Sequence, residues 1–104
     1  MSERIGKTWT LADLRAHRDA ILAVAERNGA FNVRVFGSVA RGEATPESDV
    51  DLIVCFHEGA SLLDHSGLRL DLIDLLGCNV DVISDHPRLK ERFRRRVERE
   101  AVPL

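Results

Sequence analysis

The sequence predicts an α/β (α+β) fold whose elements follow the order αβ(α)βαβα. Two long segments repeat apolar residues with the period of a helix, and three short segments are rich in β-branched residues, which favour strands. Glycines stand at the boundaries between these segments. The chain has 104 residues, close to the commonest size of one domain, so we expect residues 1–104 to form a single domain.

The first helix is expected over residues 11–28. Thr10 and Asp13 have the spacing of a capping box, and Gly29 suits the position after the helix. The apolar positions with helical spacing are Leu11, Leu14, Ile21, Leu22 and Ala25.

Two strands follow this helix, with a short helical turn between them. The first strand is expected over residues 32–36 and stops at Gly37, and the second covers residues 49–56 and stops near Gly59.

The second half alternates helix and strand again. Residues 61–76 are rich in leucine and lead to Gly77, so they predict a long helix. Residues 79–83 predict a third strand. A basic helix over residues 88–99 begins after Pro87, and we take the whole C-terminal stretch LKERFRRRVEREAVPL as this terminal helix.

Charge is strongly segregated along the chain, although the net charge is only -2. Residues 43–85 hold ten acidic residues and one base, whereas residues 88–99 hold seven bases and two acids. We expect the basic helix to dock through Leu89, Phe93 and Val97 and to form the pairs Glu91/Arg95 and Arg94/Glu98. No aromatic residue interleaves its arginines to stack bases, which argues against direct binding of nucleic acid.

Composition excludes several classes of protein. The chain is 44% hydrophobic and 31% charged, and no apolar run approaches the roughly 18 residues of a membrane span. The N-terminus lacks the apolar core of a secretory signal, so we expect a cytoplasmic protein with no membrane partner. Cys55 and Cys78 lack the spacing of a metal or redox pair, and we expect reduced, buried thiols.

Two aspartates stand where the second strand begins. Side chains two apart on a strand project from one face, so Asp49 and Asp51 are expected side by side, while Val50, Leu52 and Val54 face the core. Two adjacent carboxylates repel each other and suit a hard cation such as Mg²⁺. The alternative is structural, because aspartate also caps turns and begins strands.

A glycine and a serine end the first strand. Backbone N–H groups and a hydroxyl at Gly37 and Ser38 are suited to hold a phosphate, and Arg41 can add a guanidinium one turn later. The alternative is an ordinary strand-to-helix connection, with Ser38 as its N-cap and Arg41 on the surface.

The spacing of these residues resembles that of a known superfamily. The stretch VFGSVARGEATPESDVDLIV has Gly37-Ser38, ten residues, then Asp49-Val50-Asp51, and is similar to the polymerase β-like nucleotidyltransferases, above all the minimal nucleotidyltransferases (MNT). The resemblance implies a small mixed sheet of three to four strands flanked by helices. It also implies a third carboxylate on a later strand, for which NVDVIS offers Asp81.

The resemblance further implies transfer of a nucleotide from ATP with two Mg²⁺ ions. Asp49 and Asp51 would ligate both ions, and Asp81 would complete one metal site and help to deprotonate the incoming hydroxyl. Gly37, Ser38 and Arg41 would bind the nucleotide.

Minimal nucleotidyltransferases of this size resemble the antitoxins of HEPN/MNT pairs, which adenylylate a tyrosine of a HEPN ribonuclease toxin. The resemblance therefore implies a HEPN-type partner, and a second chain is expected to complete the site. Two alternatives stay open: transfer to a small-molecule hydroxyl, and an antitoxin that only binds its partner. The docking face would be the basic helix or the acidic helix; the acids in question are Asp64, Asp71 and Asp74.

Overall fold

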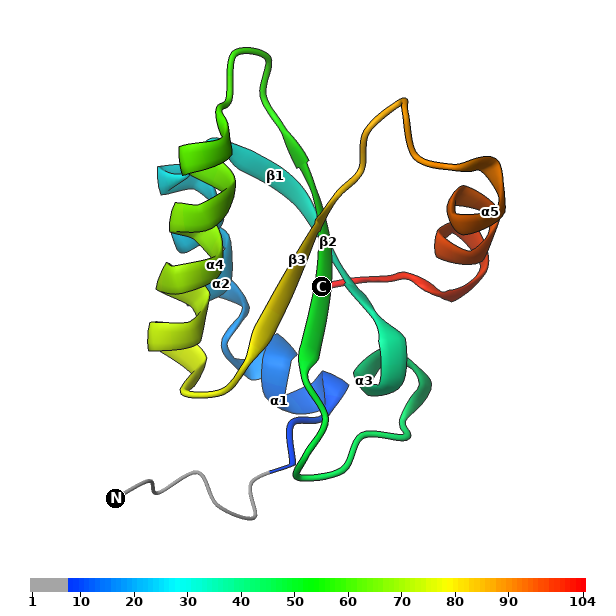
Figure 1. Cartoon of the computed structure of the whole chain (residues 1–104). Helices are drawn as coiled ribbons and strands as arrows, with labels where there is room; N and C mark the ends of the chain where they lie inside the picture. Colours follow the sequence, from blue (N-terminus) through cyan, green and yellow to red (C-terminus); the bar gives the residue numbers. More distant parts are fainter. Residues whose placement is uncertain (1–7) are drawn as a thin grey trace.

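The computed structural model describes residues 8–104, and its elements follow the expected order with one extra helix break and one extra strand (Figure 1). The elements are α1 (Leu11–Ala16), α2 (Arg18–Arg27), β1 (Ala30–Phe36), α3 (Gly37–Arg41), β2 (Val50–Phe56), α4 (Leu62–Leu76), β3 (Val80–Ser84), α5 (Glu91–Glu100) and β4 (Val102–Pro103).

The four strands form one mixed sheet in the order β3-β2-β1-β4. Strand β2 runs antiparallel to β1 and parallel to β3, and β4 runs antiparallel to β1. A mixed sheet flanked by helices confirms the predicted fold class.

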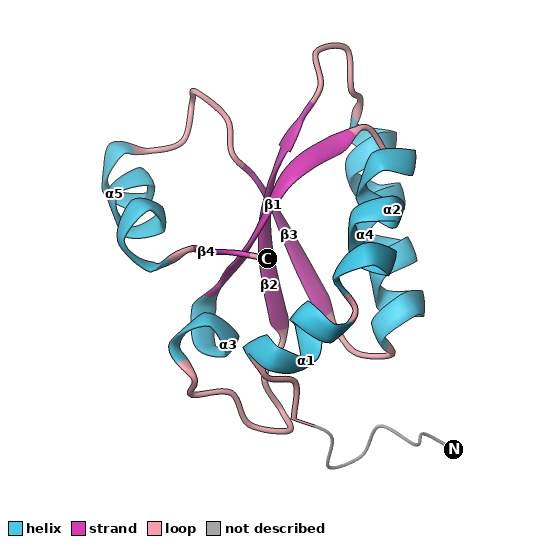
Figure 2. Cartoon of the chain, turned by 180° about the vertical axis from the view of Figure 1, so that it is seen from behind, coloured by secondary structure: helices cyan, strands magenta, loops and turns pink. Residues whose placement is uncertain are grey.

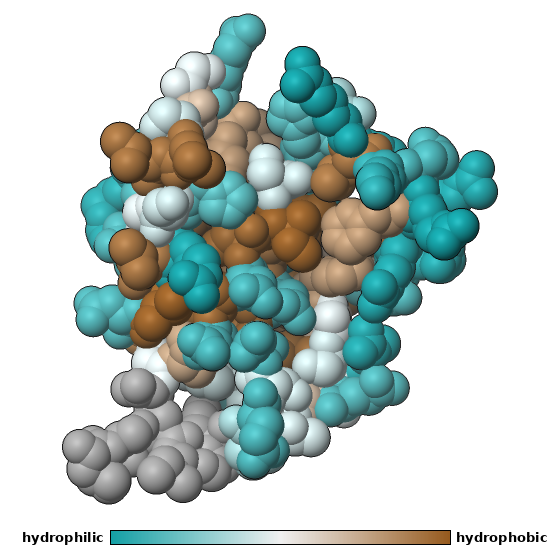
Figure 3. All heavy atoms as spheres, in the orientation of Figure 1, coloured by the Kyte–Doolittle hydropathy of each residue, from teal (hydrophilic) through white to brown (hydrophobic). Residues whose placement is uncertain are grey.

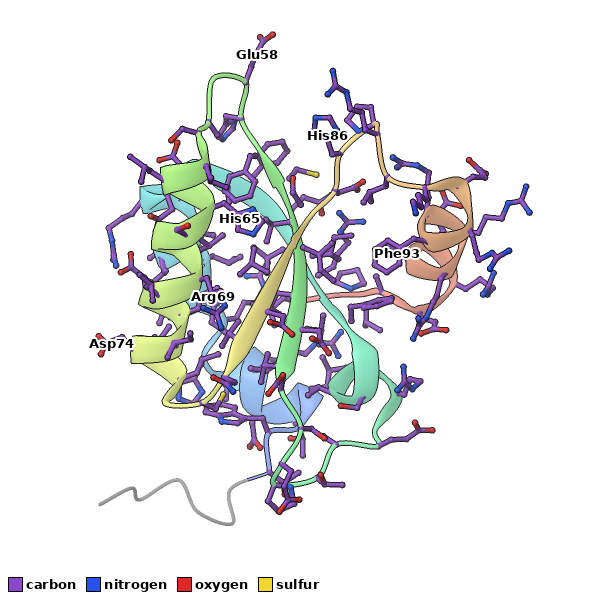
Figure 4. The ribbon with its side chains drawn as sticks, in the orientation of Figure 1. Glu58, His65, Arg69, Asp74, His86 and Phe93 are labelled. Carbon is purple, nitrogen blue, oxygen red and sulfur yellow. The ribbon has the colours of Figure 1, made fainter. Side chains whose placement is uncertain are left out.

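Helices cover the two faces of the sheet unequally (Figures 1 and 2). Helices α2 and α4 pack on one face, where they enclose the larger apolar core. Helix α5 lies on the other face over a smaller core of Phe36, Ile53 and Val97, with Phe93 packed against it. Figure 4 shows Phe93 reaching from α5 toward the sheet.

Strand β2 divides its side chains between these two faces, as its sequence predicts. Val50, Leu52 and Val54 are fully buried in the larger core, whereas Ile53 belongs to the smaller one. Since alternate residues of a strand share a face, Asp51 lies on the α5 face together with Ile53. The polar site therefore opens toward α5, away from the main core.

The expected N-terminal helix is interrupted. The capping box of Thr10 and Asp13 is present, but the helix expected over residues 11–28 breaks at His17. His17 has φ -103° and ψ 16°, its N–H bonds back to Leu14 and Arg15, and its ring meets Trp9 edge-on. The ring of His17 also lies 2.9 Å, through Nδ1, from the carbonyl oxygen of Asp13, so local side-chain contacts accompany the break.

The C-terminal helix is shorter than expected. Helix α5 starts at Glu91 rather than residue 88 and ends at Glu100, and Val102 then pairs with Val35 in β4. The prediction of helix to the C-terminus was wrong, because Pro103 does not favour helix and β1 offers a free edge. The pair Glu91/Arg95 is confirmed at 3.2 Å, whereas Arg94 binds Asp85 at 3.3 Å rather than Glu98.

The surface of α4 combines acids with exposed leucines. Leu62, Leu63 and Leu70 are 80%, 81% and 60% exposed, and Figure 3 shows apolar side chains on this part of the surface. Neither cysteine forms a disulfide, and both are half-buried rather than buried as expected. Among residues 8–104, no helix is long and apolar enough to cross a membrane.

Candidate active site

The predicted site residues come together at one end of the sheet. Strand β1 ends at Phe36, which is the register partner of Asp51 near the start of β2, and Asp51 is in turn the partner of Asp81 in the parallel strand β3. Three adjacent strands therefore place the turn at Gly37 and two carboxylates in one row. Asp49 stands just before β2 and is exposed, so the sheet does not determine its direction.

Gly37 is packed against Asp51. It has φ +73°, a left-handed conformation that other residues rarely adopt, and a Cβ at this position would overlap Oδ2 of Asp51 and lie 3.1 Å from its Cγ. The glycine thus makes room for the carboxylate as well as for the turn. The sequence motif shows both residues but not this contact.

The electrostatics of Asp51 are unusual for an aspartate. Burial, the negative charges of Asp81 and Asp49, and a hydrogen bond with Asp81 together raise the pKa of Asp51 from 3.8 to about 6. The positive charge of Arg41 opposes this shift and is the smallest of these influences. The carboxylate cluster of Asp49, Asp51 and Asp81 therefore holds concentrated negative charge that the protein only partly compensates.

The donor chemistry of the carboxylate cluster suits Mg²⁺, which prefers carboxylate oxygens and phosphates. A cation would remove the repulsion that raises the pKa of Asp51. Within the described part of the chain, however, no three Asp, Glu, His or Cys side chains are already placed to hold one ion together. Asp51 and Asp81 are within hydrogen-bond reach of each other, so the site contains a close carboxylate pair with Asp49 nearby.

Helix α3 has only five residues and carries the remaining predicted contacts. Its N-cap is Phe36, so Ser38 lies inside the helix and is not the capping residue. Arg41 ends the helix and pairs with Glu43 at 2.9 Å and with Glu100 of α5 at 3.4 Å. The hydrogen bond from Arg41 to Glu43 is the main reason that the pKa of Arg41 is raised, which keeps its guanidinium charged.

Glu100 and Arg96 are site neighbours that the sequence did not indicate. Glu100 reaches Arg41 across 59 positions of sequence through the packing of α5 on the sheet, and Arg96 pairs with Glu100 at 3.6 Å. No local motif marks either residue. A hollow of about 260 Å³ lies beside α3 and includes Trp9, Val39 and Arg41.

A larger hollow lies at the other end of the sheet and does not touch the carboxylate cluster. It has a volume of about 710 Å³ and is lined by residues of the β2–α4 and β3–α5 connections, among them His65, Asp85 and His86. Figure 4 shows His65 and His86 toward this end. Because none of the predicted site residues borders it, we place the candidate active site at the carboxylate cluster instead.

Comparison with known proteins bears on the class of this site. A family model described as a nucleotidyltransferase domain matches residues 17–103. The chain belongs to this nucleotidyltransferase family. The predicted resemblance and the predicted class of enzyme are thereby confirmed.

The named relatives of this nucleotidyltransferase are archaeal. Protein adenylyltransferase MntA of Thermococcus cleftensis is 42% identical over 89 residues, which cover 86% of this chain and 86% of the relative. A Methanocaldococcus jannaschii protein assigned as a protein adenylyltransferase is 43% identical over 76 residues, which cover 70% of this chain and 82% of the relative.

Solved structures agree with the family. A protein assigned as a minimal nucleotidyltransferase has 54% identity and a TM-score of 0.82, covering 95% of this chain and 100% of the other. A toxin–antitoxin complex with AMP-PNP shares the fold at 18% identity and a TM-score of 0.70, covering 82% of this chain and 69% of the other. The complex of tri-AMPylated Shewanella oneidensis HEPN toxin with its MNT antitoxin shares the fold at 15% identity and a TM-score of 0.64. The match covers 86% of this chain and 69% of the other.

Proposed function

We propose that this nucleotidyltransferase transfers AMP from ATP to a tyrosine hydroxyl of a HEPN-type ribonuclease toxin and thereby neutralises it. The observation that carries the proposal is the carboxylate cluster, which meets the glycine turn of α3 on the face of the sheet that opens toward α5. The names of the relatives support the donor and acceptor classes, since they describe protein adenylyltransferases and an AMPylated HEPN toxin. This chain contains no tyrosine, so the acceptor belongs to another protein.

The carboxylate cluster would hold two Mg²⁺ ions, with Asp49 and Asp51 on both and Asp81 on one. When bound, Mg²⁺ would neutralise charge on the triphosphate during transfer. The surroundings of Asp51 support this assignment: its pKa is raised first by burial and then by the negative charges of Asp81 and Asp49, and a cation would offset those charges.

The transfer itself is a substitution at the α-phosphorus of ATP. The acceptor oxygen forms a bond to this phosphorus while the bond from the phosphorus to the bridging oxygen breaks, so pyrophosphate leaves. Asp81 accepts the proton of the attacking hydroxyl. Gly37, Ser38 and Arg41 hold the outer phosphates, which orients the α-phosphorus for in-line attack.

The test is the intact mass of a candidate HEPN-type partner, for which the protein encoded beside this chain is tried first. The purified protein is incubated with ATP, Mg²⁺ and either wild type or the double variant Asp49→Asn/Asp51→Asn. A gain of one or more AMP units with wild type alone, mapped to a tyrosine, is the expected result. Asp19→Asn serves as a control, because Asp19 is an exposed carboxylate in the first turn of α2, outside the carboxylate cluster, and its replacement should leave transfer intact.

The other outcomes identify the alternative functions. A stable complex that wild type and the double variant form equally well, without any gain in mass, would show an antitoxin that works by binding alone. Transfer to a small-molecule hydroxyl, with no gain on the protein, would show a different acceptor class.

A further inference from the structure

Three side chains link the end of α5 to the predicted phosphate site. Glu100 Oε1 lies 3.4 Å from Nη1 of Arg41 and 3.6 Å from Nε of Arg96, so one carboxylate lies between two guanidinium groups. Glu100 is 26% exposed, while Arg41 and Arg96 are 38% and 50% exposed. The Arg41–Glu100–Arg96 cluster is therefore open to solvent on its cationic side.

Arg96 also lies against the glycine turn. Its guanidinium carbon is 5.4 Å from the ring centre of Phe36, the residue directly before Gly37 and the register partner of Asp51. Because cross-strand partners share a face of the sheet, Arg96 lies over the same face as Asp51. It is a second cation at the edge of the candidate site, and it comes from a different element than Arg41.

A carboxylate and a phosphate compete for the same arginine. Each of them offers two anionic oxygens that can accept hydrogen bonds from the two N–H groups of a guanidinium. A triphosphate carries more negative charge than one glutamate. A triphosphate bound at Gly37 and Ser38 would bring its outer oxygens toward Arg41. Nε of Arg41 stays paired with Glu43 at 2.9 Å, while its Nη1 faces Glu100 at 3.4 Å. We propose that Glu100 is a displaceable anion that holds Arg41 and Arg96 in the free protein, and that the outer phosphates of the nucleotide replace it.

This inference rests on the proposed function and adds two residues to it. Arg96 becomes a phosphate-binding residue, and Glu100 becomes a positioning residue that acts through Arg41 and Arg96. Glu100 thereby couples the α5–β4 end of the chain to occupancy of the nucleotide site.

The same helix supplies a matched control pair. Glu91 and Arg95 also pair with i,i+4 spacing, at 3.2 Å, but both are about 70% exposed and lie near the start of α5. An isolated pair of this kind contributes only about 0–1 kcal/mol. Glu91→Gln and Arg95→Gln therefore make the same two substitutions in the same helix as Glu100→Gln and Arg96→Gln. They leave the Arg41–Glu100–Arg96 cluster unchanged.

The experiment measures the dissociation constant of ATP in the presence of Mg²⁺ by titration calorimetry, with no acceptor protein present. Inorganic tripolyphosphate is titrated in parallel, since it has the phosphates without the nucleoside. We expect Arg96→Gln to weaken both ligands about tenfold and Glu100→Gln to strengthen both about three- to tenfold. Glu91→Gln and Arg95→Gln should leave both constants within about twofold of wild type.

The opposite signs separate a phosphate role from a structural one, because damage to α5 would weaken binding in both cluster variants. If wild type binds ATP but Glu100→Gln binds it no more tightly than wild type, Glu100 is not a displaceable anion. If Arg96→Gln binds as tightly as wild type, Arg96 does not bind phosphate. Either result overturns this inference and leaves the proposed function standing. Failure of wild type to bind ATP, both alone and together with the partner protein, would overturn the proposed function and this inference with it. Thermal unfolding of each variant verifies that the protein titrated is folded.

Discussion

Half-buried aspartates at the two ends of the sheet are surrounded by opposite charges. In the connection after β3, Asp85 binds Arg34 at 2.9 Å and Arg94 at 3.3 Å, so two guanidinium groups compensate one carboxylate. At the other end, Asp51 faces Asp81 and Asp49, and its pKa rises to about 6.

Under the proposed function, this difference separates a carboxylate that stabilises the fold from one that would bind metal. Paired charges at Asp85 hold α5 to the sheet, whereas repulsion within the carboxylate cluster costs stability in the absence of a cation.

The largest effect is expected on transfer. Asp49→Asn and Asp51→Asn should each reduce transfer of AMP at least about 10³-fold, since loss of a metal-binding carboxylate removes several kcal/mol of stabilisation of the transferring phosphate. The rate is measured by the mass gain of the partner. Near-normal transfer by Asp49→Asn would contradict the role of the carboxylate cluster.

The next effect concerns Gly37. Gly37→Ala places a Cβ on the carboxylate of Asp51 and should reduce transfer about 10–100-fold, because a small displacement of a reacting group has effects of this size. Gly29→Ala is the matched control, since Gly29 has φ +75° with no atom near its added Cβ. Both should lose about 1 kcal/mol of stability from backbone strain. Equal transfer by the two variants would show that Gly37 serves the turn only.

A smaller effect is expected at the other end of the sheet. Asp85→Asn should lower the free energy of unfolding by about 1–3 kcal/mol, because Arg34 and Arg94 lose their partner in a half-buried place. Denaturant unfolding measures this change. If Asp85→Asn is as stable as wild type, Asp85 does not stabilise the fold and does not differ from Asp51 in this respect.

The smallest effect is a gain in stability at Asp51. The folded chain keeps a proton on this carboxyl up to a pKa of about 6, whereas the unfolded chain releases it near 3.8. The folded state thus binds more protons between these values, so its stability falls as pH rises through this window and stays lower above it. Because Asp51 is partly exposed and solvent screens its charge, we expect the ionised carboxylate to lower the free energy of unfolding by only about 1 kcal/mol.

The variant Asp51→Asn has no carboxyl at this position, so its stability should not fall as the pH rises from about 4 to about 6. In EDTA, its free energy of unfolding should equal that of wild type near pH 4 and exceed it by about 1 kcal/mol above pH 6. Unfolding in denaturant from pH 4 to pH 7.5 measures both curves. Parallel curves would show that Asp51 carries no such cost.

Much of the fold was predictable because local signals agree with it. The capping box at Thr10 and the alternation of Val50, Leu52 and Val54 each determine structure within a few residues. Two features lacked such a signal. The break at His17 is marked by no glycine or proline, and the two residues of β4 are too few to show a strand period.

The residues of the site were predictable from spacing, but their interactions were not. The motif places Asp51 two residues after Asp49, yet only the sheet register brings Asp81 beside it. The contact of Gly37 with Asp51 and the approach of Glu100 to Arg41 depend on packing between distant segments. Sequence spacing therefore predicts the candidate groups of the site, and the fold determines their partners.

The most direct test of the central claim is the effect of Mg²⁺ alone on the stability of the chain. If the carboxylate cluster is arranged for a cation, Mg²⁺ at ten times its dissociation constant should raise the free energy of unfolding of wild type by about 1.4 kcal/mol. Asp85→Asn should gain as much, and Asp51→Asn should gain little or nothing. An equal gain in wild type and Asp51→Asn, or none in wild type, would contradict the account.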